Sequence, residues 1–206
     1  MLNKYEFVGK NKEEAINKIK TELTENLNDL YIEETVINGK LFKSGKVILT
    51  VITKEDVKKY IEEFILNYSK LMNIEINFEI VETDGVYNIT LVSTNNPILI
   101  GREGKTLEAF QLLLRQAVKN QTNNNIKINV DISGYKSKKL KRLEYEVKKI
   151  AYEVQNSKID ASLDPMNSYE RRKIHTLIST MNNLKTESIG EGAERHIVIK
   201  YVEKTQ

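Results

Sequence analysis

The feature that most restricts the fold of this chain is a pair of glycines near its centre. Gly101 and Gly104 stand three positions apart, directly after the apolar run 98–100 and directly before a segment with helical periodicity. Glycine adopts backbone conformations that other residues avoid, so this spacing predicts a tight loop that opens a helix. The first N–H groups of a helix lack intrahelical acceptors and lie at the positive end of its dipole. We therefore expect the loop to bind a phosphate group.

The segments around the loop have distinct periodicities. Apolar residues at helical spacing predict helices at 55–72 and 106–120, and Pro97 starts a short helical turn before the loop. Alternation of apolar and polar residues predicts strands at 74–80, 86–93 and 126–132. The expected order over residues 54–134 is helix, two strands, two helices and a strand, with the glycine loop between the two later helices.

Residues 1–53 predict a small βαββ unit. Its strands are expected at 4–8, 31–37 and 47–52, and Asn38-Gly39 favours a tight turn between the last two. Asn11, with Glu14 three positions later, fits a helix N-terminus. The apolar face expected for this helix consists of Ile16, Ile19, Leu23, Leu27 and Leu30.

Residues 135–206 predict a third unit that begins with a long amphipathic helix. The stretch 136–149 holds seven basic and two acidic residues, yet it keeps an apolar stripe. A short strand is expected at 159–163, then a helix capped by Asn167 or Ser168 that runs to about Met181. Two closing strands are expected at 184–188 and 196–202.

Composition narrows the class of protein. The 206 residues carry a formal net charge of +3, a bias too weak to indicate nucleic-acid binding without local clustering. The absence of cysteine removes disulfides, thiolate metal sites and a cysteine nucleophile. The first residues contain no apolar leader, and no segment is long enough to span a bilayer, so we expect a cytoplasmic protein. With two histidines and no metal-ligand spacing, we expect no metal and no cofactor.

Two motifs resemble known nucleic-acid-binding domains. The order of elements at 54–134, with the loop Gly101-Arg102-Glu103-Gly104, resembles a KH domain of the prokaryotic type, in which the Gly-x-x-Gly loop clamps the backbone of single-stranded RNA or DNA. The spacing of Arg171 and His175 resembles the R-three-H domain, which binds single-stranded nucleic acid. The preceding Asp164-Pro165-Met166 and the closing stretch 194–199 add to this second resemblance.

With a βαββ unit in front, the whole chain resembles the Jag family, also called SpoIIIJ-associated proteins. The resemblance implies an α+β fold of three small units. These are an N-terminal βαββ domain at 1–53, a prokaryotic-type KH domain (αββααβ) at 54–134, and an R-three-H α/β domain at 135–206 with a leading basic helix.

The resemblance also implies which residues bind nucleic acid. In the KH unit they are Gly101, Arg102, Glu103, Gly104 and Lys105. Loops of this family usually carry basic residues between the glycines, so we expect Glu103 to lower affinity without abolishing it. The alternative is that the two glycines only make a tight turn.

In the third unit the implied binding residues are Arg171, His175 and Arg195. Arg171 and His175 are four positions apart and so share one helix face. We expect Arg171 to pair with phosphate and His175 to hydrogen-bond or stack, with Arg195 beside them across the sheet. The alternative is an ordinary solvated helix face.

Two further surfaces are candidates for binding. The basic helix offers a track for a nucleic-acid backbone, or else it is a solvated face. The residues of this track are Lys138, Lys139, Lys141 and Arg142. Leu41 and Phe42 lie in a basic loop and are candidates for docking a partner, or else Phe42 covers the small core.

Enzyme functions receive little support from the sequence. Gly104-Lys105-Thr106 looks like the end of a mononucleotide phosphate loop, but Leu99 occupies the position of that motif's first glycine. His175 and His196 could be imagined in a nuclease, yet no paired base and nucleophile stand at a recognisable separation. We therefore expect a binding protein and not an enzyme.

The resemblance implies a single-stranded RNA-binding regulator linked to cell-envelope growth or division. It further implies a small KH protein partner and a YidC-type membrane insertase, and a homodimer is a further expectation. The chain would reach the membrane only through such partners. The alternative function is a protein adaptor at the insertase whose nucleic-acid binding is weak or vestigial.

Overall fold

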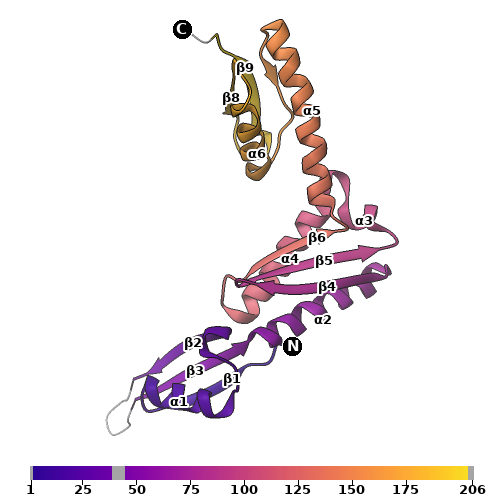
Figure 1. Cartoon of the computed structure of the whole chain (residues 1–206). Coiled ribbons are helices and arrows are strands. Elements are labelled where there is room, and N and C mark those ends of the chain that lie inside the picture. The colour runs from indigo at the N-terminus through magenta and orange to yellow at the C-terminus, as the bar shows by residue number, and fades with distance from the viewer. Residues whose placement is uncertain (1, 39–44, 204–206) are drawn as a thin grey trace. The chain divides into compact units, whose positions relative to one another are not determined.

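The computed structural model describes residues 2–38 and 45–203 (Figure 1). The chain divides into two compact units, Met1–Ser133 and Gly134–Gln206. Within the described residues the fold is α+β, with three separate three-stranded sheets. Two of these sheets belong to the first unit and the third belongs to the second unit.

The first sheet has the order β1-β3-β2 with antiparallel pairing, and one helix packs on it. Its elements are β1 (Tyr5–Gly9), α1 (Lys12–Glu22), the 3₁₀ turn η1 (Leu27–Asp29), β2 (Leu30–Ile37) and β3 (Lys46–Thr53). Asn11 caps α1 by accepting from the Glu14 N–H at 2.9 Å. The core of this sheet is formed by Phe7, Ala15, Ile19, Leu49 and Val51.

The predicted length of the first helix is wrong. Leu23 already has extended backbone, and its N–H closes the helix on the Ile19 carbonyl at 2.8 Å. Leu27 and Leu30 therefore lie in η1 and at the start of β2, from where they still pack on the same core. Helical periodicity persisted in the sequence because all three side chains face one core from different elements. The predicted docking residues Leu41 and Phe42 lie outside the described residues.

The second sheet has the order β4-β5-β6, in which β4 and β5 are antiparallel and β5 and β6 parallel. Its elements are α2 (Lys54–Met72), β4 (Ile76–Thr83), β5 (Val86–Ser93), α3 (Asn96–Ile100), α4 (Lys105–Thr122) and β6 (Lys127–Ile132). The helices α2 and α4 contact each other, and the rings of Tyr68 and Phe110 pack in a tilted arrangement with centroids 4.6 Å apart. This is the predicted order of elements, except that β4 begins at Ile76 because Ile74 closes the turn after α2.

No linker separates the first two sheets. Thr53 ends β3 and also caps α2, accepting from the Asp56 N–H at 3.0 Å. The Lys54 Nζ lies 2.7 Å from Asp29 Oδ1 and 3.4 Å from Glu82 Oε2. The hydrogen bond to Asp29 raises the pKa of the Lys54 ammonium. Residues 1–53 and the following sheet therefore belong to one compact unit.

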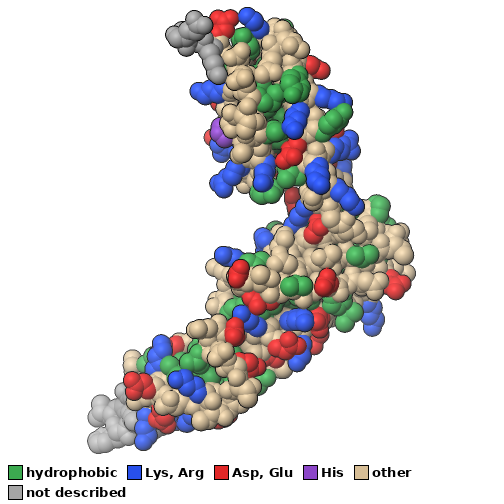
Figure 2. Space-filling model, in the orientation of Figure 1, with side chains coloured by type: hydrophobic (Ala, Val, Ile, Leu, Met, Phe, Trp, Pro, Cys, Tyr) green, Lys and Arg blue, Asp and Glu red, His purple; other side chains and the backbone are tan. Residues whose placement is uncertain are grey.

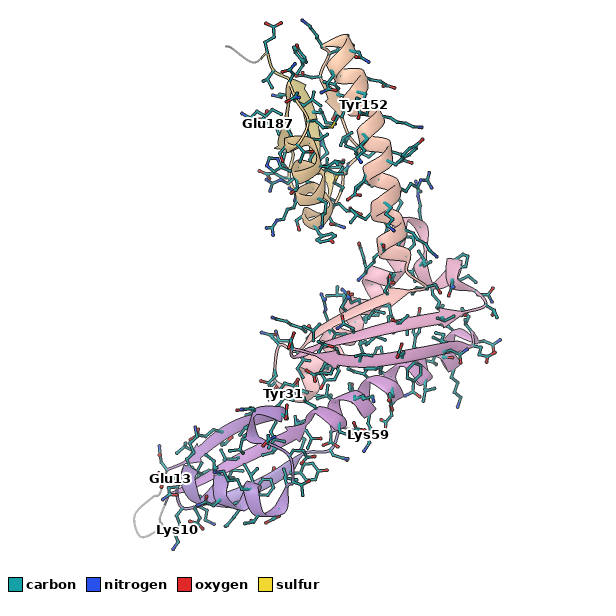
Figure 3. All side chains as sticks on the ribbon, viewed as in Figure 1. Lys10, Glu13, Tyr31, Lys59, Tyr152 and Glu187 are labelled. Carbon is teal, nitrogen blue, oxygen red and sulfur yellow. The ribbon has the colours of Figure 1, made fainter. Side chains whose placement is uncertain are left out.

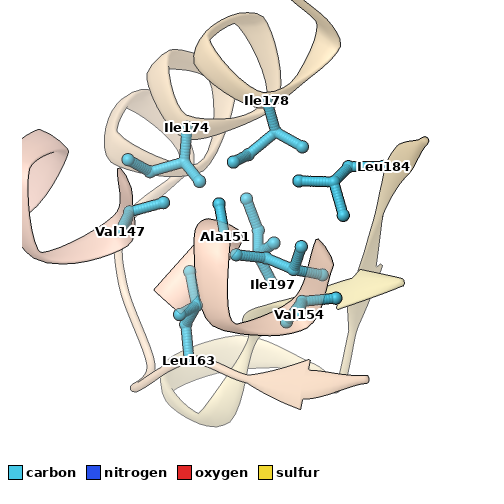
Figure 4. Packing of buried hydrophobic residues seen from close by; sticks show 9 residues of the cluster. Val147, Ala151, Val154, Leu163, Ile174, Ile178, Leu184 and Ile197 are labelled. Carbon is cyan, nitrogen blue, oxygen red and sulfur yellow. The ribbon is translucent and has the colours of Figure 1, made fainter. Parts of the chain in front are cut away.

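The second unit contains the antiparallel sheet β7-β9-β8 and two helices. Its elements are α5 (Tyr135–Ser157), β7 (Ala161–Ser162), α6 (Ser168–Ser179), β8 (Leu184–Ile189) and β9 (His196–Tyr201). The helices and strands meet in one apolar core (Figure 4). That core includes Val147, Ala151, Val154, Leu163, Ile174, Ile178, Leu184 and Ile197.

Two boundaries in this unit differ from the predicted ones. The predicted strand at 159–163 is reduced to Ala161–Ser162, although the Leu163 N–H still donates to the Ile197 carbonyl at 2.9 Å. The helix α6 ends at Ser179, two residues before the predicted end at Met181. Of the two predicted caps, Asn167 is the one observed. In the part of the chain that is described, no helix is long and apolar enough to cross a membrane.

Candidate nucleic-acid interface

The two glycines of the loop have backbone conformations that residues with a side chain rarely adopt. Gly101 ends α3 with φ 72° and ψ −177°, and Gly104 opens α4 with φ 89°. A Cβ added to Gly101 would lie 2.1 Å from Thr106 Oγ1 and 2.7 Å from Thr106 Cβ. The loop therefore brings backbone against the first turn of an 18-residue helix, where unpartnered N–H groups and the helix dipole favour an anion.

The exposed side chains of the loop carry charges of both signs. Arg102 and Glu103 are exposed, with side-chain exposures of 89% and 66%. Glu103 sits in the left-handed region at φ 55°, and its Oε1 lies 3.9 Å from Arg102 Nε. Lys105 is also exposed, in the first turn of α4. Arg102 and Lys105 thus flank the carboxylate that was expected to weaken binding.

A groove lies between α4 and β6 of the same unit, and none of the residues that line it were among the predicted site residues. It has a volume of about 520 Å³ and is lined on its basic side by Arg115, Lys119 and Lys127. Side chains of α4 partly cover the free edge of β6, because the Val130 N–H donates to Gln111 Oε1 at 2.9 Å and Arg115 Nε donates to the Ile128 carbonyl at 2.7 Å. Gln111 and Arg115 stand four apart on α4, and that spacing was the available signal.

The second site is built on α6, whose start is held by a reciprocal cap. Asn167 Oδ1 accepts from the N–H groups of Tyr169 and Glu170, each at 3.0 Å. The Glu170 carboxylate in turn accepts from the Asn167 N–H at 3.1 Å and pairs with Lys139 Nζ at 2.8 Å. Since Glu170 is buried, this network determines where α6 begins and which residues face β8.

The side chains of Arg171 and His175 extend from α6 and each contacts a residue of β8. Arg171 Nη1 donates to Ser188 Oγ at 2.9 Å, and His175 Nδ1 lies 2.6 Å from Thr186 Oγ1. Both contacts can form together because residues four apart on a helix and residues two apart on a strand share a face and have similar spacing. The helix and the strand therefore hold these side chains in register.

Arg195 joins the same cluster from the turn before β9. Its Nε donates to Ser188 Oγ at 3.1 Å, so one hydroxyl accepts from two guanidinium groups. Arg171 also donates to the Met166 carbonyl at 3.3 Å. A guanidinium has five N–H donors, and most of those on Arg171 and Arg195 are left for a ligand. Two cations held beside one neutral oxygen attract an anion such as phosphate.

The predicted residues of this site lie together, as expected for Arg195 beside Arg171 and His175. Sequence reasoning missed Ser188 and Thr186, which receive these side chains. The signal was present, because both residues alternate with Glu187 on the predicted strand 184–188 and so share one face.

The predicted track on α5 is partly occupied by ion pairs. Lys139 pairs with the buried Glu170, and Arg142 Nε lies 2.9 Å from Glu146 Oε1. Lys138 and Lys141 are exposed. The four residues therefore differ in what they offer a phosphate, although they stand in one basic helix.

Within the described part of the chain, imidazole and carboxylate side chains do not gather into a metal site. Across the described ranges, no group of three or more histidine, cysteine, aspartate or glutamate side chains could hold a metal ion. His196 lies on β9, where its Nδ1 is 2.9 Å from the Glu194 carbonyl oxygen.

Comparisons with known proteins identify the domains at 54–132 and 140–201. Residues 54–132 match the family model described as the KhpA/KhpB KH domain, and residues 140–201 match the R-three-H domain. The chain is 33% identical to the RNA-binding protein KhpB of Clostridium symbiosum, over 91% of this chain and 86% of that protein. It is 27% identical to the RNA-binding protein KhpB of Bacillus subtilis (strain 168), over 94% of this chain and 96% of that protein.

The fold and the comparisons together define a protein with a KH domain followed by an R-three-H domain. The chain belongs to the KhpB family, which is the Jag family of the sequence resemblance.

Proposed function

We propose that this chain binds single-stranded RNA at two places and acts by binding, without turnover. The observation that carries the proposal is a cluster of three side chains. Arg171 and Arg195 both donate to Ser188 Oγ, and His175 contacts Thr186 Oγ1 on the same strand. Its charges fit a phosphate and its imidazole fits a hydrogen bond or a stacked base. The names of the similar proteins, which describe RNA binding, support the same substrate.

The glycine loop is the second binding place in this proposal. The loop backbone and the first turn of α4 hold a phosphate, and Arg102 and Lys105 offset Glu103. Two weak sites on one chain raise the overall affinity because the second contact forms at high effective concentration. A single RNA strand would then contact both motifs.

Partners belong to the same proposal. Leu112 and Leu113 on α4 are 66% and 62% exposed, which supports docking of a small KH protein or of a second copy of this chain. A link to a YidC-type insertase, a place in the cytoplasm and a role in cell-envelope growth are proposed from the family alone. Single-stranded DNA is an alternative ligand for the same two sites.

The test measures affinity for a single-stranded RNA as a function of salt concentration. Arg171→Ala with His175→Ala, and separately Arg102→Ala with Lys105→Ala, should each weaken binding and flatten its salt dependence. The logarithmic slope should fall by about 0.7 for each phosphate that is no longer neutralised. Substituting the glycines is less informative, because a side chain at Gly101 collides with Thr106.

The matched control is Lys4→Ala with Lys20→Ala, which removes two exposed positive charges outside both sites. Unchanged affinity in both site variants would favour the adaptor function. Cleavage of the RNA on incubation with magnesium would instead indicate nuclease activity.

A further inference from the structure

A regular stripe of side chains runs along the exposed side of α5. Lys138, Lys141, Tyr145, Lys148 and Tyr152 recur at spacings of three and four residues, so they lie in one line along the helix; we name them the α5 stripe. Figure 2 shows lysine and arginine side chains gathered along this helix, and Figure 3 labels Tyr152 on it. The stripe alternates basic and aromatic side chains over its last four members.

The tyrosines of the stripe are unusually open to solvent. Tyr145 is 61% exposed and Tyr152 is 58% exposed, while the opposite side of α5 is buried in the core through Val147, Ala151 and Val154. Two flat rings seven residues apart are separated by about 10.5 Å along the helix axis. Neither ring belongs to the core, and both are more than half exposed to solvent.

The charges of the stripe also favour an anionic ligand. Among the described residues, Lys141 and Lys148 make no ion pair, whereas Lys139 and Arg142 beside the stripe are paired with Glu170 and Glu146. Lys149 places its ammonium 4.5 Å from the centroid of the Tyr145 ring. No acidic residue stands in the stripe, and the neighbouring Glu144 is half-buried.

We propose that the α5 stripe is a further binding face for single-stranded RNA, in which Tyr145 and Tyr152 stack on bases while Lys141 and Lys148 pair with phosphates. Alternating aromatic and basic side chains suit a flexible single strand, because every base has a face to stack and every linkage a charge. A membrane surface fits less well, since the stripe lacks the Leu, Phe or Trp that would enter lipid. The inference rests on the proposed RNA binding and adds a third contact surface to it.

The experiment compares two double variants of the full chain. Tyr145→Leu with Tyr152→Leu removes both rings and keeps bulk, whereas Tyr145→Phe with Tyr152→Phe keeps both rings. Because α5 buries its other side, both variants should fold, which circular dichroism checks. We expect the Leu variant to bind a single-stranded RNA at least roughly fivefold more weakly and the Phe variant to retain its affinity. A 5-bromouracil RNA should crosslink to Tyr145 or Tyr152 in the unchanged protein.

The outcomes separate this inference from the proposed function. If the Leu variant binds RNA as well as the unchanged chain while Arg171→Ala with His175→Ala binds weakly, the α5 stripe is not an RNA face and the proposed function stands. If the unchanged chain binds no RNA, both fail. If substituting the stripe lysines weakens binding to vesicles of anionic phospholipid but leaves RNA affinity unchanged, the α5 stripe binds membranes and the inference is overturned.

Discussion

At the scale of single residues, the hydroxyl of Ser188 organises more of the R-three-H site than its size suggests. It accepts from Arg171 and from Arg195, which approach it from α6 and from the turn before β9. Neither arginine has another side-chain acceptor among the described residues. Ser188 therefore acts as a positioning residue, since it holds two cations without neutralising them.

Ser188→Ala should loosen both guanidinium groups and weaken RNA binding by roughly fivefold, as expected when about 1 kcal/mol of hydrogen bonding is removed. Because Ser188 is exposed, the free energy of unfolding should stay within about 0.5 kcal/mol of the unchanged value. Fluorescence anisotropy with labelled RNA and urea denaturation measure the two quantities. Ser179→Ala is the control, and equal affinities for the two variants would count against this role of Ser188.

Glu103 is the residue that sets the charge of the glycine loop. Glu103→Lys should tighten RNA binding by roughly fivefold at low salt, because a like-charge contact of about 1 kcal/mol is removed. Glu103→Gln should give a smaller gain. Both changes keep a side chain of similar length at the left-handed φ of 55°. The gain should fade as salt screens the charges, and a gain that is independent of salt would contradict an electrostatic cause.

At the scale of elements, the interface depends on where α6 begins. The capping residues Asn167 and Glu170 set the first turn, and Glu170 also fastens that turn to Lys139 of α5. A shift of one residue would rotate Arg171 and His175 away from Ser188 and Thr186. The cap therefore contributes to the geometry of the site as well as to the stability of the helix.

Asn167→Ala should lower the free energy of unfolding by about 1 kcal/mol, because two helical N–H groups lose their acceptor. Ser168→Ala should have almost no effect, since Ser168 is the first helical residue and not the cap. Urea denaturation of both variants provides the comparison. A larger loss for Ser168→Ala than for Asn167→Ala would show that the cap lies one residue later.

At the scale of the whole molecule, the two compact units have separate apolar cores. The core of Gly134–Gln206 draws its buried residues from Val147 to Ile199 alone. Stability in one unit is thus supported by contacts within that unit.

Ile174→Ala should lower the free energy of unfolding of the second unit by about 2 to 5 kcal/mol, because Ile174 is fully buried in its core. Hydrogen exchange should then speed up in residues 134–206 and stay unchanged in residues 1–133. Leu49→Ala, which opens the core of the first sheet, should give the reverse pattern. Faster exchange in both units after either change would show that the units unfold together.

Periodicity and turn chemistry are local properties, so the amino-acid pattern alone was enough to predict the order of elements, the glycine loop and the placement of Arg171 and His175 on one helix face. It also indicated the family, since two spaced motifs occur in a characteristic order. It could not show that α1 stops at Glu22, because Leu23, Leu27 and Leu30 face the same core from other elements. Only the tertiary structure placed Ser188 between two arginines and paired Lys139 with Glu170, leaving the α5 stripe open to solvent. Those contacts join residues distant in the chain, and no local pattern specifies which side chains meet.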